Sequence, residues 1–124
     1  MRTKSRTLTE QELEIMKVVW DLQSATVRDV YEALLRRRKI AYTTVMTMMN
    51  ILEEKGYLKK RAEDKAYRYR PTRRKTKVIK EMVQDFVRRV FNGSAQPLLV
   101  QLVKDRQLSA KDLAEISRQI QEAE

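Results

Sequence analysis

Residues 41–56 constrain the fold more than any other part of the chain, because they form a helical pattern with two unlike faces. One face is apolar and carries Val45, Met48, Met49 and Leu52. The other is almost uncharged and carries Thr43, Met46, Thr47, Asn50 and Glu54. Short hydroxyl, amide and thioether side chains suit contact with base edges in a major groove. A second packing interface with another helix explains the same pattern, so this segment alone leaves both interpretations open.

A basic β-hairpin is predicted directly after this helix, which Gly56 ends. Residues 57–61 and 66–70 alternate apolar or aromatic with basic side chains, and the polar residues 62–65 lie between them. Tyr57, Tyr67 and Tyr69 recur at the strand period, so we expect them to pack onto the helices beneath the hairpin.

Two further helices are predicted before residue 41. Thr9 with Glu12, and Thr26 with Asp29, form capping-box patterns that start helices at residues 10–22 and from 27 to about 38. Residues 39–41 are either a connector or a one-bond strand that completes the sheet of the hairpin. Three helices followed by a basic hairpin is the order of a winged helix-turn-helix domain.

The positive charge is concentrated in the same part of the chain. The net charge is +10, and residues 1–76 hold 19 Lys and Arg against 10 Asp and Glu, whereas residues 77–124 hold 8 against 7. A polyanion partner for the first part is the simplest inference. In a winged domain bound to double-stranded DNA, the base-contacting residues are predicted to be Thr43, Thr44, Met46, Thr47 and Asn50. The phosphate-contacting residues are predicted to be Arg36, Arg37, Arg38, Lys59, Lys60 and Arg61.

The remaining residues are predicted to form a helical dimerisation domain, with a domain boundary between residues 71 and 72. Apolar pairs recur every four residues from Val78 to Phe91, and two shorter helices follow, the last capped by Ser109 with Asp112. Three helices of under about 50 residues cannot bury all of this apolar surface within one chain, so a second copy of the chain is expected to cover it. The predicted interface consists of Val78, Met82, Phe86, Val90, Phe91, Leu98, Leu102, Leu113 and Ile116. A three-helix hairpin packed onto the first domain is the alternative.

Catalysis is excluded more clearly than binding. The chain has no His and no Cys, which removes the commonest acid-base catalyst and the usual zinc ligands. With two Gly in the chain, a glycine-rich phosphate loop is not available. We therefore predict no enzyme activity, no cofactor and no metal. No apolar run approaches the roughly 18 residues of a membrane span, so we expect a cytoplasmic protein without membrane contact.

Several short motifs resemble those of the penicillinase-repressor family, which includes methicillin-resistance and copper-responsive repressors. The resemblance lies in residues 8–9 with 12–20, in residues 26–31, 41–47 and 54–58, and in residues 67–71. It implies a homodimeric bacterial repressor on an inverted repeat with TACA/TGTA-type half-sites. Met46 and Ile51 stand where some relatives have Arg.

The same resemblance implies release from DNA by proteolysis of the C-terminal part, through a membrane metalloprotease sensor system. The cut in relatives commonly falls within an Asn-Phe pair, and this chain has Gln101 and Leu102 there. The Cys-rich metal-sensing motif of the copper-responsive members is absent, because the chain has no Cys. A protein-interaction adaptor with a winged-helix fold is the alternative function, and the charge asymmetry favours DNA over it.

Overall fold

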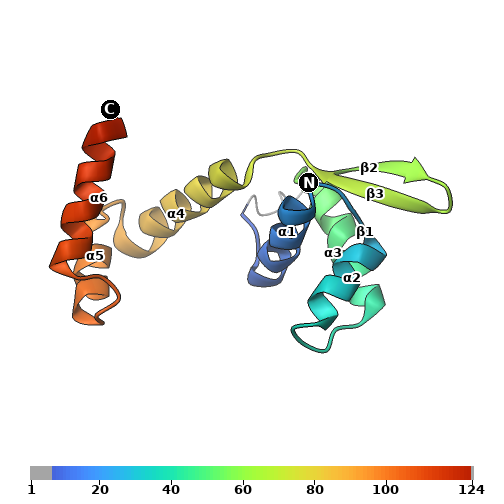
Figure 1. The fold of residues 1–124 in the computed structure, drawn as a ribbon, viewed down its shortest axis with the longest axis horizontal. Helices are drawn as coiled ribbons and strands as arrows, with labels where there is room; N and C mark the ends of the chain where they lie inside the picture. Colours follow the sequence, from blue (N-terminus) through green and yellow to red (C-terminus); the bar gives the residue numbers. More distant parts are fainter. Residues whose placement is uncertain (1–6, 124) are drawn as a thin grey trace. The chain divides into compact units, whose positions relative to one another are not determined.

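A computed structural model describes residues 7–123 of the chain, so residues 1–6 and 124, at the ends of the two predicted domains, lie outside it. Figure 1 shows the predicted helices and hairpin in the predicted order, with an additional short strand between the first two helices. The elements are α1 (Glu10–Leu22), β1 (Ala25–Thr26), α2 (Val27–Leu35), α3 (Tyr42–Glu54), β2 (Leu58–Glu63), β3 (Ala66–Pro71), α4 (Lys75–Phe91), α5 (Gln96–Lys104) and α6 (Ala110–Ala123).

Reciprocal capping starts three of these helices where the sequence predicts it. The Thr9 hydroxyl accepts from the Glu12 N–H at 3.1 Å, and Glu12 Oε1 accepts from the Thr9 N–H at 2.9 Å. Thr26 and Asp29 make the same pair of bonds at α2, and Ser109 and Asp112 make it at α6. Each pair satisfies two backbone donors that the first helical turn leaves without a partner.

Helix α3 ends at the predicted glycine. Gly56 has a φ of +87°, and the N–H of Tyr57 donates to the carbonyl of Leu52 at 2.9 Å. This closure is available to glycine because the left-handed region costs it nothing. It turns the chain directly from α3 into β2.

The sheet has three antiparallel strands in the order β1-β3-β2. The third strand is Ala25–Thr26, which pairs with Tyr69 and Arg68 of β3. Residues 39–41 form the connector between α2 and α3, so the alternative in which they complete the sheet is wrong. Helix α2 also ends at Leu35, three residues earlier than expected, and residues 36–38 form a turn.

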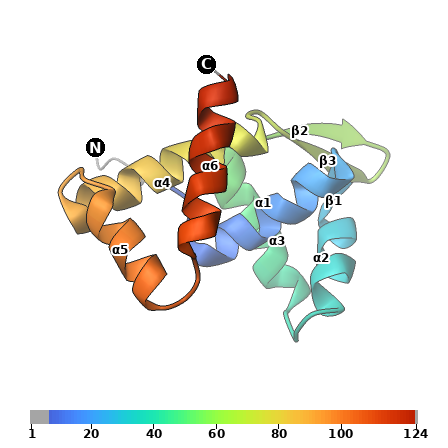
Figure 2. The same cartoon turned by 60° about the vertical axis from the view of Figure 1, so that its left-hand side comes forward.

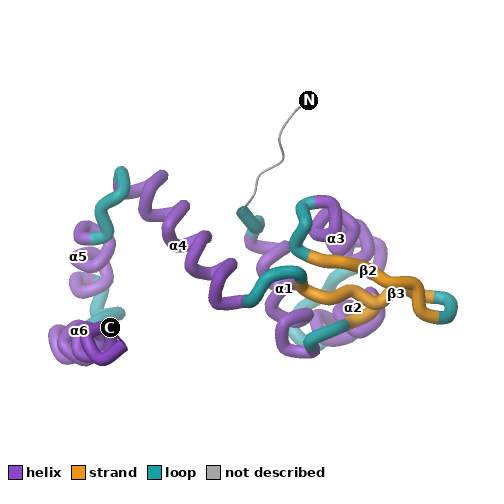
Figure 3. Tube along the Cα trace, turned by 90° about the horizontal axis from the view of Figure 1, so that it is seen from above, coloured by secondary structure: helices purple, strands orange, loops and turns teal. Residues whose placement is uncertain are grey.

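Contacts within the chain divide it into two compact units, residues 1–82 and 83–124. The first unit has a continuous apolar core that joins α1, α2, α3 and the sheet. Its buried side chains include Ile15, Met16, Val19, Val30, Leu34, Val45, Met49, Leu52, Leu58 and Tyr69. Figures 2 and 3 show the β2–β3 hairpin, the wing, which extends beyond the helices of this unit.

The division between the units falls inside α4. Val78 is buried in the core of the first unit, and Met82 packs against that core. The sequence places a boundary between two domains at residues 71 and 72, whereas the contacts divide the chain at residues 82 and 83. Contacts do not test which parts fold independently, so the domain boundary stays a prediction. The second unit consists of the rest of α4 with α5 and α6. No helix in the described part of the chain is long and apolar enough to cross a membrane.

Candidate nucleic-acid interface

The five predicted base-contacting residues all lie on the exposed side of α3. Thr43, Thr44, Met46, Thr47 and Asn50 are exposed, whereas the apolar residues between them belong to the core. No charged residue occurs between Lys39 and Glu53, so this outer face is uncharged along most of the helix. The helix therefore presents hydroxyl, thioether and amide groups on a rigid support.

Asn50 is held by the wing. The Tyr69 hydroxyl donates to Oδ1 of Asn50 at 3.0 Å, and Tyr69 itself is 2 % exposed. Burial, followed by the nearby Glu53 carboxylate, raises the pKa of Tyr69 above its ordinary value. The phenol therefore stays protonated near neutral pH and keeps its hydrogen for Asn50.

The predicted phosphate cluster before α3 is divided by an ion pair. Arg36 and Arg37 are exposed, but Nη2 of Arg38 lies 2.8 Å from Oε1 of Glu14 on α1. A second bond from Nε of Arg38 to Oε2 of Glu14 measures 3.4 Å. These bonds lower the pKa of the Glu14 carboxyl. Arg38 consequently has a carboxylate partner on the protein, and a phosphate contact would compete with it.

The wing presents its basic residues on two faces. Register pairs Lys59 with Arg70 and Arg61 with Arg68 on one face, and Lys60 with Tyr69 on the other. Arg68 is engaged by Glu63 at 3.0 Å and lies 4.0 Å from Asp29. The three predicted wing residues therefore do not act as one cluster, because Lys60 faces away from Lys59 and Arg61.

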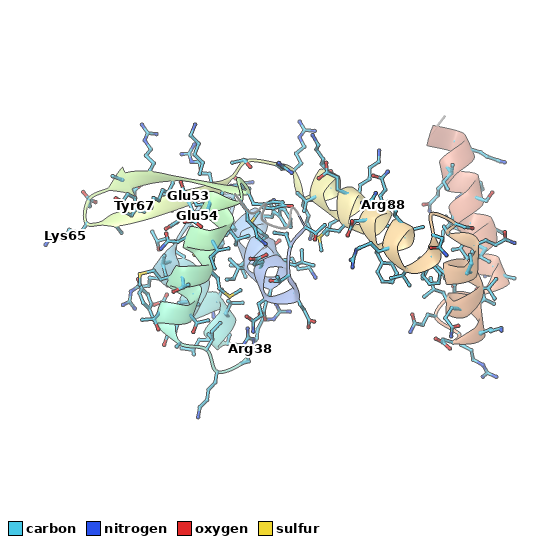
Figure 4. The ribbon with its side chains drawn as sticks, turned by 180° about the vertical axis from the view of Figure 1, so that it is seen from behind. Arg38, Glu53, Glu54, Lys65, Tyr67 and Arg88 are labelled. Atoms are coloured by element: carbon cyan, nitrogen blue, oxygen red, sulfur yellow. The ribbon has the colours of Figure 1, made fainter. Side chains whose placement is uncertain are left out.

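Tyr67 differs from the other two tyrosines of the hairpin. Tyr57 and Tyr69 are buried as expected, but Tyr67 is 49 % exposed, and the Lys60 ammonium lies 4.6 Å from its ring centroid. The expectation that Tyr67 packs onto the helices is wrong, because it lies on the part of the wing that extends beyond them. Figure 4 shows Tyr67 on the wing, with Glu53 and Glu54 at the end of α3 nearest the hairpin and Arg38 at the opposite end of the unit.

Two exposed arginines near this surface were missed by the sequence prediction. Arg70 lies opposite Lys59 on the wing, and Arg28 on α2 lies over the ring of Tyr42, the first residue of α3, at 5.8 Å from its centroid. The strand alternation of residues 66–70 could have identified Arg70. Nothing local indicates Arg28, because its position beside α3 depends on how α2 and α3 pack.

The predicted dimer-interface residues fall into two groups. Val78 lies in the core of the first unit, because α4 begins by covering that core, and it is not accessible to another chain. On the second unit, Phe86 is 42 % and Val90 52 % exposed, and Ile116 is also exposed. Phe91, Leu98, Leu102 and Leu113 of the same unit are half-buried, and so is Met82, the last residue of the first unit. The Phe86 and Phe91 rings meet edge to face, with centroids 5.9 Å apart.

The two residues at the predicted cleavage position lie in the middle of α5. Gln101 is exposed, and Leu102 is half-buried. Within residues 7–123, no group of three acidic, His or Cys side chains could hold a metal ion.

The penicillinase repressor family matches residues 8–122 of this chain. The penicillinase repressor of Bacillus licheniformis is 26% identical over 115 residues, which cover 93% of this chain and 90% of that protein. The transcriptional regulator BlaI of Mycobacterium tuberculosis is 34% identical over 99 residues, covering 78% and 72%. The methicillin resistance regulatory protein MecI of Mammaliicoccus sciuri is 21% identical over 116 residues, covering 94% of each chain. These relatives are repressors and regulators rather than enzymes, in agreement with the sequence prediction.

Two solved structures resemble the fold. The solution structure of the DNA-binding domain of the repressor BlaI has a TM-score of 0.53 and 28% identity, and it covers 60% of this chain and 92% of that one. The crystal structure of the oxidised form of MarR from E. coli has a TM-score of 0.52 and 16% identity, covering 94% of this chain and 75% of that one, and shows likeness of fold alone. The predicted fold class, a winged helix with a further helical part, is confirmed.

Proposed function

This chain belongs to the penicillinase repressor family of transcriptional repressors, and we propose that it acts as a homodimer on an inverted-repeat operator in double-stranded DNA. In this proposal the outer face of α3 enters the major groove and the wing lies along the phosphate backbone. Such a protein acts where the DNA is, in the cytoplasm.

The uncharged outer face of α3, with basic residues at both of its ends, is the observation that carries the proposal. Thr43, Thr47 and Asn50 offer donors and acceptors that suit base edges. Arg36 and Arg37 precede the helix, and the wing follows it. A face built only for solvent in such a charged chain would carry the charges itself, whereas here they flank the helix, where phosphates would lie.

Phosphate contacts are assigned to the basic side chains that point away from the helices. On the wing these are Lys59, Arg61 and Arg70, which share one strand face. Lys60 lies on the opposite face of the wing, over the ring of Tyr67. It can reach the phosphate backbone of DNA only from the side on which α3 lies. Phosphate contacts of this kind position the protein and carry no sequence information.

Dimerisation is proposed to occur through the second unit. Val83, Phe86, Val90, Val100, Val103, Ile116 and Ile120 are exposed large apolar residues on its three helices. So much exposed apolar surface on a unit of this size marks an association site. A second copy is the occupant that suits it, because a two-fold axis presents the same patch twice and each copy covers the other.

Two-fold symmetry fixes the form of the operator. Two α3 helices related by a dyad read the same bases on opposite strands, so the site is an inverted repeat. Half-sites are expected about 10 base pairs apart, or a multiple of that, so that both helices meet the groove on one side of the duplex.

Release from the operator is proposed to follow cleavage in α5 by a protease of a membrane sensor system. A cut at Gln101 or Leu102 would separate α6, with its exposed Ile116 and Ile120, from the rest of the interface. Monomers bind one half-site and lose the advantage of linked binding, which reaches about 10²–10⁴. The argument depends on the apolar surface removed rather than on the residues at the cut.

Selection of bound sequences from random duplex DNA tests the proposal. The full chain is expected to enrich an inverted repeat with a fixed spacing. Enrichment of one unpaired half-site would contradict the dimer. Binding that enriches no sequence, with weak salt dependence, would instead support a winged-helix adaptor for proteins.

A further inference from the structure

The contact between Tyr69 and Asn50 fixes which end of the Asn50 amide faces outward. Oδ1 accepts from the Tyr69 hydroxyl at 3.0 Å, and this hydroxyl belongs to a residue that is 2 % exposed. The oxygen and nitrogen of a carboxamide are bonded to the same carbon and point in different directions within one plane, so an inward Oδ1 leaves Nδ2 on the outer side. Asn50 is exposed, and no residue in the described part of the chain pairs with its Nδ2.

The direction of this hydrogen bond follows from the surroundings of the phenol. A phenol with its ordinary pKa of about 10 is protonated at neutral pH, and burial raises the pKa of Tyr69 further, so the hydroxyl has a hydrogen to donate. In the described residues, Oδ1 of Asn50 is the acceptor placed to receive it. Reversing the amide would set Nδ2 against the hydroxyl and leave the phenol proton without that acceptor.

We propose that Asn50 contacts DNA as a hydrogen-bond donor alone, so that it selects guanine or thymine over adenine or cytosine at the base it faces. The proposal rests on the proposed function, in which the outer face of α3 lies in the major groove. An asparagine with both amide groups available pairs with the N6 and N7 atoms of adenine. Here the oxygen is turned inward to Tyr69, and the outward NH₂ matches the O6 carbonyl of guanine or the O4 carbonyl of thymine. Adenine presents one acceptor, N7, beside an amino donor, and cytosine presents an amino donor alone, so both match the outward NH₂ less well than guanine or thymine does.

Tyr69 acts in this scheme as a positioning residue that never touches DNA. Its backbone lies in the central strand of the sheet, opposite Lys60 of β2 and Ala25 of β1. A strand paired on both sides holds the hydroxyl at a fixed place beneath α3. The wing therefore determines part of the base preference of the helix as well as contacting the backbone.

The test is sequence selection from random duplexes with the full chain and three variants, after circular dichroism has established that each is folded. Asn50→Ala identifies the base position that depends on Asn50. At that position the wild type is expected to hold guanine or thymine. Tyr69→Phe frees Oδ1 and is expected to raise the share of adenine or cytosine there about tenfold, with the rest of the motif unchanged. Tyr67→Phe, which removes a hydroxyl two residues away on the same strand face, is expected to keep the wild-type motif.

An Asn50→Asp variant gives a second test that does not alter a buried residue. Its inward oxygen still accepts from Tyr69, and its outward oxygen is an acceptor, so the preference is expected to switch to adenine or cytosine even as overall affinity falls. A wild-type preference for adenine or cytosine at the Asn50-dependent position overturns the proposal, as does a Tyr69→Phe motif identical to that of the wild type. If the wild type enriches a motif that Asn50→Ala leaves unchanged, the role of Asn50 fails while the proposed function stands. If the wild type enriches nothing, both fail.

Discussion

Nζ of Lys55 lies 2.8 Å from Oε1 of Glu12, and this ion pair joins the end of α3 to the start of α1 with side chains that are 9% and 5% exposed. The same carboxylate oxygen accepts from the N–H of Thr9 at 2.9 Å. One buried charge pair thus holds the candidate recognition helix and completes the cap of α1.

Replacing Lys55 by Met is expected to destabilise the first unit by about 3–5 kcal/mol, because it leaves the Glu12 carboxylate buried without its counter-ion. Chemical denaturation measures the change. Adding Glu12→Gln to that variant is expected to restore part of the stability. The control is Arg28→Met, which breaks an ion pair with side chains 68% and 55% exposed and should cost under about 1 kcal/mol. Equal costs for Lys55→Met and Arg28→Met would contradict the assignment.

Asn50→Ala and Arg61→Ala are expected to weaken DNA binding in different ways. Asn50→Ala should cost about 1–3 kcal/mol on the selected site and little on random duplex. Arg61→Ala should weaken both and reduce the slope of log K against log salt by about 0.9 for each phosphate that the protein no longer neutralises. Lys111→Ala removes an equal charge from α6 and should leave the slope unchanged. Titrations at several salt concentrations distinguish them, and identical behaviour of the two variants would disprove the division of roles.

Phe86→Asp is expected to convert the dimer to a monomer, because it places a charge in the proposed apolar interface. Gln84→Asp introduces the same charge at an exposed polar position of the same helix and should leave the dimer intact. Light scattering at micromolar concentration gives the mass of each. A wild-type monomer, or a Phe86→Asp dimer, would falsify the proposed interface.

Truncation after Val100 is expected to weaken operator binding at least about tenfold, since the protein no longer binds two half-sites as a linked pair. The core residues of the first unit all precede the cut, so its helical circular dichroism should persist. Operator titration of full-length and truncated chains gives the comparison. Undiminished affinity would show that release does not work through this segment.

High pH should destabilise the first unit through its two buried tyrosines. Desolvation raises the pKa of both Tyr57 and Tyr69, so their stabilising effect is complete below the ordinary value of about 10 and is lost as pH rises through the folded-state value. Unfolding free energies measured across this range should fall less steeply for Tyr69→Phe than for the wild type.

Local patterns predicted those parts of the fold that local bonds determine. Thr9 with Glu12, and Ser109 with Asp112, lie three residues apart, and their hydrogen bonds form within one turn. The two-residue strand β1 has no such pattern. Ala25 and Thr26 are extended because Tyr69 and Arg68 of the wing pair with them, and that partner is remote in the sequence.

In the candidate site, too, the sequence predicted what local patterns determine and missed what remote residues determine. Periodicity placed Thr47 and Asn50 on the outer face of α3, but it could not reveal that Tyr69 holds Asn50 or that Glu14 holds Arg38. Val78 shows the same limit for α4. The apolar stripe of α4 indicates that this helix packs on more than one side. Only the tertiary structure shows that Val78 packs into the core of the first unit.

Thr26 joins α2 to the wing through different atoms of one residue. Its hydroxyl accepts from the N–H of Asp29 at the start of α2, while its backbone pairs with Arg68 in β3. Strand β1 cannot form until the hairpin has folded back beside it, which closes a long loop and costs chain entropy. An isolated helix forms without that cost. The helix-turn-helix and the wing consequently reach their native arrangement together, and folding of the first unit should be cooperative rather than stepwise, with no state in which the helices are native and the wing is detached.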